Sequence, residues 1–438
     1  MRADAAKLFG AAFRPIQLFL QLEAASGILL LLCAAVALLW ANLDPTGYRA
    51  VFDYPLALGA GGAVARFSVV QLINDGLMAI FFFLVGMEIK RELAVGELRT
   101  PSRAVLPLIA ALGGMALPAG IFLAFNAGGP GQNGWGIPMA TDIAFCIGIL
   151  TLLKTRVPHG LVVFVVALAI FDDIGGILVI AFFYGHGLDP VWLGVAAALT
   201  AVLFAMNRAF VHGILPYTVV GAALWLALHE GGIHATISGV ILGLMIPARP
   251  RRQPREVVEQ LGEHVSEILQ RPADEALDNA EIAMIENQLE DIQAPLDRFV
   301  EGLHTWVAFL IMPLFALANS GVYLGDAGPG TLAEPVALGT ALGLFAGKQL
   351  GIFGFTAVAV RLGVASMPGH ASLLKLFGVS VIGGIGFTVA LFIAGLAFPG
   401  APELLDEAKI GILLGSLVSG LVGYAILRAS RVIDAPGP

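Results

Sequence analysis

Charged residues are scarce in this 438-residue chain: Asp, Glu, Lys and Arg make up 13% of it, and hydrophobic residues make up 58%. Soluble domains carry roughly 25% charged residues. The mean hydropathy is +0.87, and apolar runs of about 20 residues, long enough to cross a bilayer, recur between short polar turns. The composition excludes a soluble globular domain and predicts a polytopic membrane protein, with the lipid bilayer as its surroundings.

Cysteine is scarce too. The chain contains only Cys33 and Cys146, and both lie in apolar segments. A disulfide framework is therefore excluded, and we expect two small buried packing residues. The first apolar run, 28–43, has no small-residue A-x-A exit of the kind that ends a signal peptide, so we expect it to be a first membrane span.

Two further classes lack their signatures. No basic surface suited to nucleic acid is present, so we expect no nucleic-acid partner. His229, Glu230 and His234 resemble a zinc-protease helix only superficially, because the H-E-x-x-H pattern needs its second histidine at 233, where Ile233 stands. A membrane metalloprotease is unsupported, and we expect no enzyme activity and no bound cofactor.

Hydropathy predicts an all-α fold of twelve transmembrane helices. The expected spans are about 26–42, 72–89, 103–125, 137–153, 159–184, 190–206, 211–228, 232–247, 304–323, 336–360, 374–398 and 405–427. We divide the chain into spans 1–8 (1–249), a loop (250–303) and spans 9–12 (304–438), which form one integral membrane domain.

The basic residues predict the orientation. With the N-terminus in the cytoplasm, 20 of the 24 Lys and Arg residues fall on the inner side. Arg49, Arg66 and Lys409 fall outside, and Lys348 lies within a span. Cytoplasmic segments carry the excess of basic residues, so we expect both termini in the cytoplasm of a bacterial cell, with the protein in its inner membrane.

The long cytoplasmic loop is strongly acidic. Between 256 and 301 there are 13 acidic and 2 basic residues. Apolar residues at 282, 285, 289, 292 and 296 follow heptad-like spacing, and Leu261, Val265 and Ile268 predict a preceding amphipathic helix that stops near Pro272. The loop is either a solvated helical hairpin or a regulatory or self-association element; a homodimer remains open.

Two adjacent aspartates are the most informative feature. Asp172 and Asp173 lie at the middle of the apolar stretch 160–184, which holds no other charged residue. An Asp at a helix centre costs roughly 2.5–3.5 kcal/mol on insertion scales. Neighbours on a helix point about 100° apart, so we expect divided roles in binding or relaying cations; the alternative is a structural ion pair.

Two spans contain helix breakers at membrane depth. Span 4 is interrupted by Pro138, Thr141 and Asp142, and span 11 by the glycine cluster 383–386. Irregular backbone at this depth is tolerated only where it is buried or lines a cavity. Breaks at the centres of spans 3–5 and 10–12 indicate inverted repeats with a substrate site between them.

Lys348 lies at the middle of span 10, and we pair it with Asp172 as a coupling element; the alternative is a purely structural salt bridge. Asp142, beside Thr141, can neutralise the positive ends of the broken helices. Direct ligation of a cation by Asp142 is the second interpretation.

Three more polar residues are weaker candidates. Asp75 opens span 2 and is read as interfacial or functional. Glu88 closes that span and indicates a cytoplasmic mouth or a solvated helix end. His234 is either a satisfied polar contact or a residue of a pH response, because histidine titrates in the physiological range.

Taken together, these residues resemble the NhaA family of bacterial Na+/H+ antiporters, over nearly the whole chain outside the loop 250–298. The similarity lies in seven segments: INDGLMAIFFFLVGMEIKREL (73–93), PMATDIAF (138–145), LAIFDDIGGI (168–177), GIHATISGV (232–240), MPLFALANSGV (312–322), GKQLGI (347–352) and GGIGFTVALFIAGLAF (383–398).

The resemblance implies a site and an activity. Asp173 would be the main Na+ ligand with Asp172, Lys348 would pair with Asp172, and Asp142 would balance the crossed helices 4 and 11. The family is itself a standard example of inverted-repeat transporters. Its members export Na+ or Li+ against more than one H+, are activated by alkaline cytoplasmic pH, and serve pH and sodium homeostasis.

The chain departs from the family in one segment. Family members carry an acidic residue and histidines before span 9 that act in the pH response. Here Glu301 and His304 remain, with the glutamate shifted and one histidine missing. The departure concerns the pH set-point rather than the transport chemistry.

The sequence argues against two rival functions, and a third differs from exchange in its kinetics. A Na+-coupled symporter of an organic solute needs a larger polar cavity, and the spans hold few extra polar groups. An intramembrane aspartyl protease needs aspartates on separate helices, which Asp172 and Asp173 are not. A passive channel would show neither saturation nor pH coupling.

Overall fold

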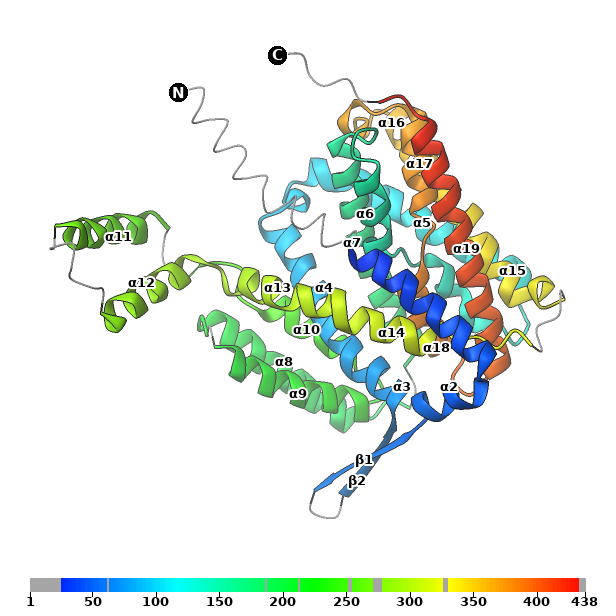
Figure 1. Ribbon diagram of the computed structural model, residues 1–438, viewed down its shortest axis with the longest axis horizontal. Helices are drawn as coiled ribbons and strands as arrows, with labels where there is room; N and C mark the ends of the chain where they lie inside the picture. The colour runs from blue at the N-terminus through cyan, green and yellow to red at the C-terminus, as the bar shows by residue number, and fades with distance from the viewer. Residues whose placement is uncertain are drawn as a thin grey trace. The chain divides into compact units, whose positions relative to one another are not determined.

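The chain is predominantly helical in a computed structural model that describes residues 25–60, 63–185, 187–211, 213–250, 254–270, 278–325 and 330–432 (Figure 1). Nine helices in these ranges are long and apolar enough to cross a membrane, and a tenth is the bent pair α17 (Leu373–Ile382) and α18 (Phe387–Ala397). The polytopic all-α class is confirmed.

The count of twelve spans is not confirmed. The predicted spans 7 and 8 correspond to α9 (Ile214–Glu230) and α10 (Ile237–Met245), which have 17 and 9 residues. The other ten predicted ranges each coincide with one of the candidate spans or the bent pair.

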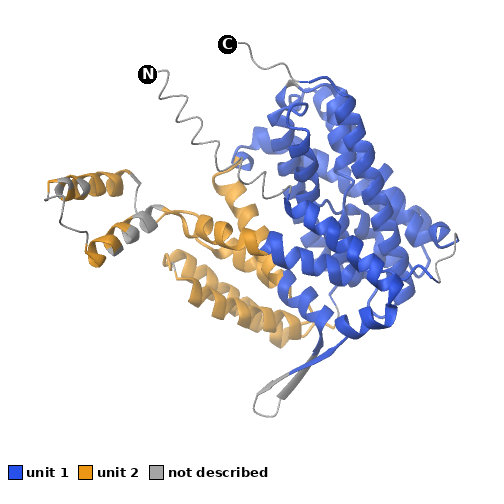
Figure 2. Ribbon diagram, viewed as in Figure 1, with its two compact units in different colours: residues 1–78, 97–186, 307–438 blue, residues 79–96, 187–306 orange. Residues whose placement is uncertain are grey.

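The chain divides into two compact units, coloured separately in Figure 2. The first comprises 1–78, 97–186 and 307–438, and the second comprises 79–96 and 187–306. The two stretches that the sequence marks as broken, and the aspartate pair, all belong to the first unit.

The first unit contains most of the long helices. They are the helix Ala25–Leu43, α5 (Pro101–Asn126), α7 (His159–Phe183) and α19 (Pro402–Ala429). Shorter elements are α2 (Pro45–Phe52), α3 (Val69–Gln71), α6 (Ile143–Leu152), α14 (Met312–Asn319), α15 (Pro335–Leu342) and α16 (Lys348–Arg361). The 3-10 helix η3 (Gln132–Met139) precedes α6.

Three π-helical turns interrupt the spans: η1 (Leu72–Leu77), η4 (Val307–Ile311) and η6 (Gly343–Gly347). Such turns are frequent at functional sites. The first contains Asp75 and the third directly precedes Lys348, so two of the three lie at residues that the sequence singled out.

A β-hairpin between the first two spans is absent from the sequence prediction. Strands β1 (Pro55–Ala60) and β2 (Ala63–Ser68) pair antiparallel, with Leu56 opposite Phe67. The segment that holds Arg66 therefore contains regular structure rather than a plain loop.

The second unit is built on α4 (Met78–Ala94), α8 (Pro190–Arg208), α9 and α10. Helix α10 packs against α4 without space for side chains at two positions. A Cβ on Gly239 would lie 2.1 Å from the Ala79 carbonyl, and one on Gly243 would lie 2.6 Å from the Phe83 carbonyl. Small residues let membrane helices approach closely.

Side chains satisfy the carbonyl end of the short helix α10. The Lys90 ammonium donates to the carbonyls of Leu244, at 2.8 Å, and Ile246. The Asn207 amide donates to the Met245 carbonyl at 2.6 Å. The last carbonyls of a helix lack intrahelical partners, so these contacts allow α10 to end after nine residues.

The acidic segment contains α11 (Pro254–Leu269) and α12 (Asn279–Ile292), followed by α13 (Pro295–Trp306). Helices were expected here, but the heptad-like stripe does not continue as one helix. Residues 293–294 are not helical and Pro295 starts a new helix, since proline is favoured in a first turn and disfavoured in a helix interior.

Burial separates the spans into two kinds. In the most apolar window of Gln132–Leu152, 67% of residues are buried within the protein, against 11% for Pro190–Arg208. The exposed side chains of α8 include Val191 and Phe204. An apolar helix with this exposure suits contact with lipid, whereas the broken span 4 lies inside the protein.

Candidate ion-binding site

Asp172 lies at the middle of α7 with 2% of its surface exposed. Its Oδ2 accepts a hydrogen bond from the Lys348 ammonium at 2.5 Å and one from the Thr141 hydroxyl at 2.6 Å. Its Oδ1 is buried and has no hydrogen-bond partner. One oxygen of this carboxylate is hydrogen-bonded to Lys348 and Thr141, and the other can accept a proton or bind a cation.

Lys348 begins α16, directly after the π-helical turn η6, and its side chain is fully buried. Helix α16 is held tightly against α5, because a Cβ on Gly351 would lie only 2.1 Å from the Gly113 carbonyl. Lys348 makes the contact with Asp172 that the sequence predicted. A buried pair of this kind is costly to break, since the remaining charge has no partner.

Asp173 is the next residue of α7 and is 8% exposed. Successive side chains on a helix diverge by about 100°. Asp173 therefore points in a different direction from Asp172, whose Oδ2 bonds Lys348 and Thr141.

Span 11 is broken between Ile382 and Phe387, and its two halves are bent by 45°. The break contacts the non-helical residues of span 4. The Asp142 backbone N–H donates to the Ile385 carbonyl at 2.7 Å, and the Thr141 hydroxyl lies 3.1 Å from the Gly383 carbonyl. The two interrupted spans satisfy each other's backbone groups, as membrane depth requires.

The Thr141 hydroxyl reaches both the Asp172 carboxylate and the Gly383 carbonyl. A hydroxyl has one hydrogen to donate, so it can satisfy only one of these acceptors at a time. Thr141 thereby links the state of Asp172 to the break in span 11.

Asp142, which is 2% exposed, caps two helices. Its Oδ1 accepts from the Phe145 N–H of α6 at 3.3 Å, and its Oδ2 accepts from the Thr388 N–H of α18 at 3.1 Å and from the Thr388 hydroxyl. Helix N-termini carry partial positive charge. This geometry suits charge compensation better than cation ligation.

Thr388 was not singled out from the sequence. It lies two residues after the glycine cluster, at the start of α18, where a hydroxyl or carboxylate commonly caps a helix. Its position just after a predicted break was the available signal.

Cys146 donates its thiol to the Ile382 carbonyl at 3.3 Å and is fully buried. Both cysteines are free, and Cys33 is half-buried rather than buried as expected.

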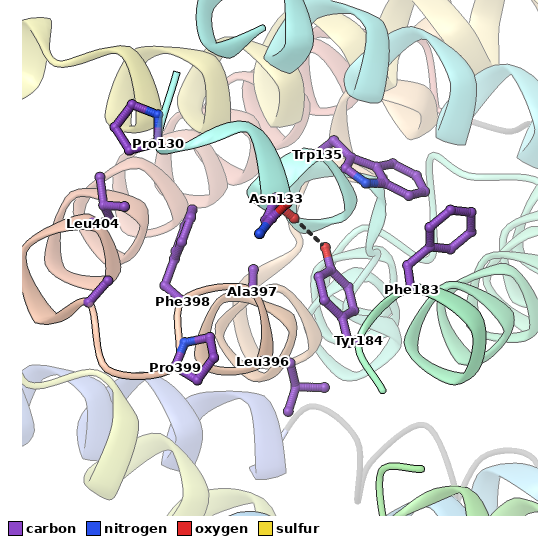
Figure 3. Close-up of a pocket in the computed structure, with 11 residues that line it drawn as sticks. Pro130, Asn133, Trp135, Phe183, Tyr184, Leu396, Ala397, Phe398, Pro399 and Leu404 are labelled. Atoms are coloured by element: carbon purple, nitrogen blue, oxygen red, sulfur yellow. Dashed lines mark hydrogen bonds between the residues drawn. The ribbon is translucent and has the colours of Figure 1, made fainter. Parts of the chain in front are cut away.

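A cavity of about 320 Å³ lies at the end of α7 (Figure 3). The Tyr184 hydroxyl donates to the Asn133 carbonyl at 2.8 Å across it, and Trp135 packs edge-on against Phe183. Its lining includes none of the predicted ion-site residues, so this cavity is not the candidate site.

A larger cavity of about 660 Å³ is lined by Asp53, Arg49, Asp406 and Lys409 among others. Tyr48 closes one side, where its hydroxyl lies 2.8 Å from the Leu317 carbonyl and 2.9 Å from the Ala318 carbonyl and can donate to one of them at a time. Burial raises the pKa of Tyr48, so it stays a neutral donor.

The residues predicted for a pH response or a cytoplasmic mouth lie on several elements. Asp75 is half-buried in η1, and Glu88 is half-buried in α4. The His234 ring lies 2.8 Å from the Thr236 hydroxyl, the polar contact considered for it. Glu301 and His304 lie inside the helical stretch Pro295–Asn319, which begins earlier than the predicted span 9.

Within the described ranges, no group of three or more His, Cys, Asp or Glu side chains is arranged to hold a metal ion. Carboxylate, hydroxyl and carbonyl oxygens, which surround Asp172 and Thr141, are ligands that hard cations prefer.

Buried carboxylates on one span, a fully buried lysine beside them and two interrupted helices with capped ends define an ion-coupled secondary transporter. The family model described as Na+/H+ antiporter 1 matches residues 17–427. The chain belongs to this family, whose members are transporters and not enzymes.

Curated relatives agree over nearly full length. The chain is 62% identical to the Na+/H+ antiporter NhaA of Anaeromyxobacter sp. (strain Fw109-5), with 100% of this chain and 96% of the relative covered. It is 60% identical to Na+/H+ antiporter NhaA 1 of Myxococcus xanthus, with 96% and 94% covered. The NhaA of Rhodopirellula baltica is 46% identical, with 94% and 93% covered.

Proposed function

We propose that this protein exchanges cytoplasmic Na+ or Li+ for external H+ across the bacterial inner membrane. The observation that carries the proposal is the buried Asp172 carboxylate, with Oδ2 held by Lys348 and Thr141 and Oδ1 without a partner. A desolvated oxygen without a partner favours either a proton or a cation. Membership in an antiporter family supports the same reading.

The exchange follows from competition at the aspartate pair. When the cytoplasm is alkaline, Asp172 and Asp173 lose protons and bind Na+, with Asp173 as the main ligand. The loaded site opens outward, releases Na+ and takes up protons. The two carboxylates titrate as a coupled unit.

The surrounding residues have separate tasks in this cycle. Lys348 compensates the Asp172 charge while no cation is bound, and its contact weakens when Na+ arrives. Asp142 holds the two helix ends at the break, and Thr141 transmits the state of Asp172 to them.

The cycle is electrogenic if two protons replace one Na+. One net positive charge then moves inward per turnover, and the membrane potential contributes about 2.3 kcal/mol per charge per 100 mV. Such an exchanger serves pH and sodium homeostasis. The transported ions Na+, Li+ and H+ are its ligands, and it needs no cofactor.

The remaining features complete the proposal. Both termini and the acidic segment 250–303 face the cytoplasm, between spans 1–8 and spans 9–12. Glu88, His234, Glu301, His304 and Asp75 are the candidates for the pH response or the mouth. Two copies can associate as a homodimer.

Proton movement in everted membrane vesicles from an antiporter-deficient host tests the proposal. A respiratory pH gradient is established, NaCl or LiCl is added across a pH series, and its dissipation is followed. Asp173→Asn is expected to abolish the response because it removes the main ligand's charge. Glu259→Gln, on the exposed face of α11, is the matched acidic control.

Dissipation by the wild type and the control, but not by Asp173→Asn, is the expected result. A wild-type protein that ignores both cations at every pH would reject antiport. Full activity of Asp173→Asn would reject the assignment of the site. A symporter would instead require an organic solute together with Na+ before the gradient collapses.

A further inference from the structure

The N-terminus of α18 has a second partner besides Asp142. Ser416 lies on α19, is 7% exposed, and its Oγ accepts from the N–H groups of Gly386 at 3.3 Å and Phe387 at 3.2 Å. The next N–H, that of Thr388, is bonded to Asp142. Three consecutive amides of one buried helix end are therefore shared between a serine and an aspartate.

This division matters because the first amides of any helix have no partners within the helix. Their exposed dipoles carry about half a positive charge. In the interior of a membrane protein, no bulk water can screen that charge, so side chains must accept hydrogen bonds from these amides. The neutral Ser416 hydroxyl accepts from two of the amides, those of Gly386 and Phe387. The Asp142 carboxylate accepts from the third, that of Thr388.

We propose that Ser416 is a positioning residue for the cation site, and this inference rests on the proposed antiport. The hydroxyl anchors the start of α18 to the uninterrupted helix α19. It thereby fixes Thr388 where Asp142 can cap α18 and α6 at once. Asp142 in turn follows Thr141, whose hydroxyl bonds Asp172.

The path from Ser416 to Asp172 consists of close contacts within the first unit. Loss of the Ser416 hydroxyl leaves two buried amides without an acceptor, so their partial positive charge near the break is no longer compensated. Positive charge there disfavours a cation at the neighbouring aspartates. Loss of the hydroxyl also removes the anchor of α18 on α19. Helix α18 can then shift toward Asp142 and displace Thr141. Both effects weaken Na+ binding without removing any ligand.

Ser419 supplies a matched control on the same helix. It is buried, as Ser416 is, but its hydroxyl has no hydrogen-bond partner. Ser419→Ala and Ser416→Ala each delete one buried oxygen from α19 three residues apart. A general packing role predicts equal effects of the two changes, whereas the positioning role predicts an effect at Ser416 alone.

The test measures the Na+ concentration dependence of exchange in everted vesicles for the wild type, Ser416→Ala, Ser416→Thr and Ser419→Ala. Losing one hydroxyl acceptor is expected to raise the apparent KM for Na+ about three- to tenfold in Ser416→Ala, with the maximal rate nearly unchanged. Ser416→Thr keeps the hydroxyl and Ser419→Ala keeps the contact, so both should match the wild type.

The inference is overturned if Ser416→Ala keeps the wild-type KM, if Ser419→Ala raises the KM equally, or if Ser416→Thr is as impaired as Ser416→Ala. Should Ser416→Ala fail to reach the membrane, Ser416→Cys replaces it. The thiol is a weaker acceptor of similar size, and an intermediate rise in KM is then expected. A wild type without exchange would instead reject the proposed function, and the inference would fall with it.

Discussion

Two ion pairs in this protein have opposite surroundings. Lys348 and Asp172 meet at 2.5 Å with both side chains fully buried, whereas Arg255 and Glu259 of α11 meet at 3.0 Å with 89% and 65% of their side chains exposed. Exposed pairs contribute little because water screens them. A buried pair is costly to form and costly to break. The environment, rather than the number of charges, decides which charges matter.

The acidic segment makes the same point at larger scale. It holds 13 acidic residues between 256 and 301, and Glu259 of α11, one of them, has 65% of its side chain exposed. The proposed ion site has three carboxylates and one lysine, and every one of these residues is at most 8% exposed.

Of the substitutions that test this comparison, removal of Lys348 should have the largest effect on stability and on exchange. Lys348→Ala leaves the Asp172 charge without its partner in the protein interior. We therefore expect a loss of about 3–5 kcal/mol in stability and a loss of exchange. Thermal unfolding of the purified protein measures the first effect, and vesicle assays measure the second.

The double variant Lys348→Met with Asp172→Asn is the control, since it removes both charges and should recover much of the stability while remaining inactive. If Lys348→Ala unfolded at the wild-type temperature, the pair would not be the buried interaction described above.

Removing the double cap at Asp142 should rank second. Asp142→Ala deprives the N-termini of α6 and α18 of their acceptor, at a cost of about 1–2 kcal/mol per helix end. A lower unfolding temperature and a raised apparent KM for Na+ are expected.

Asp142→Asn keeps an acceptor oxygen and should lie between the alanine variant and the wild type. Equal damage from both substitutions would show that the charge rather than the capping hydrogen bonds is needed.

Breaking the exposed pair should have the smallest effect. Glu259→Gln and Arg255→Ala are each expected to change stability by less than about 0.5 kcal/mol and to leave the apparent KM for Na+ unchanged. A clear loss of activity in either variant would contradict the contrast between the two regions and would assign a role to the charge of α11.

Much of the fold was accessible from the sequence. Hydropathy located ten of the predicted spans, and the breakers around Asp142 and Gly383 located both interruptions, because lipid penalises any deviation from a continuous apolar helix. The predictions of spans 7 and 8 were less accurate. The second of them is a short helix, because Lys90 and Asn207 from other helices donate hydrogen bonds to its last carbonyls.

The structure also contains elements without a strong sequence signal. The hairpin β1–β2 is short, and the π-helical turns arise from local backbone packing rather than from a periodic pattern. The heptad-like spacing from 282 to 296 runs across Pro295, and the proline starts a new helix there.

The sequence by itself determined that the chain crosses the membrane repeatedly, that its scarce buried charges lie on spans 4, 5 and 10, and that Lys348 and Asp172 suit each other. These features follow from the high cost of burying a charge in lipid, which makes each one conspicuous. Only the tertiary structure decided which amides Asp142 caps, that Thr141 bridges Asp172 and Gly383, and that Ser416 holds the start of α18. A serine on an apolar helix costs little anywhere, so its partner depends entirely on which backbone groups the packing of other helices brings within reach.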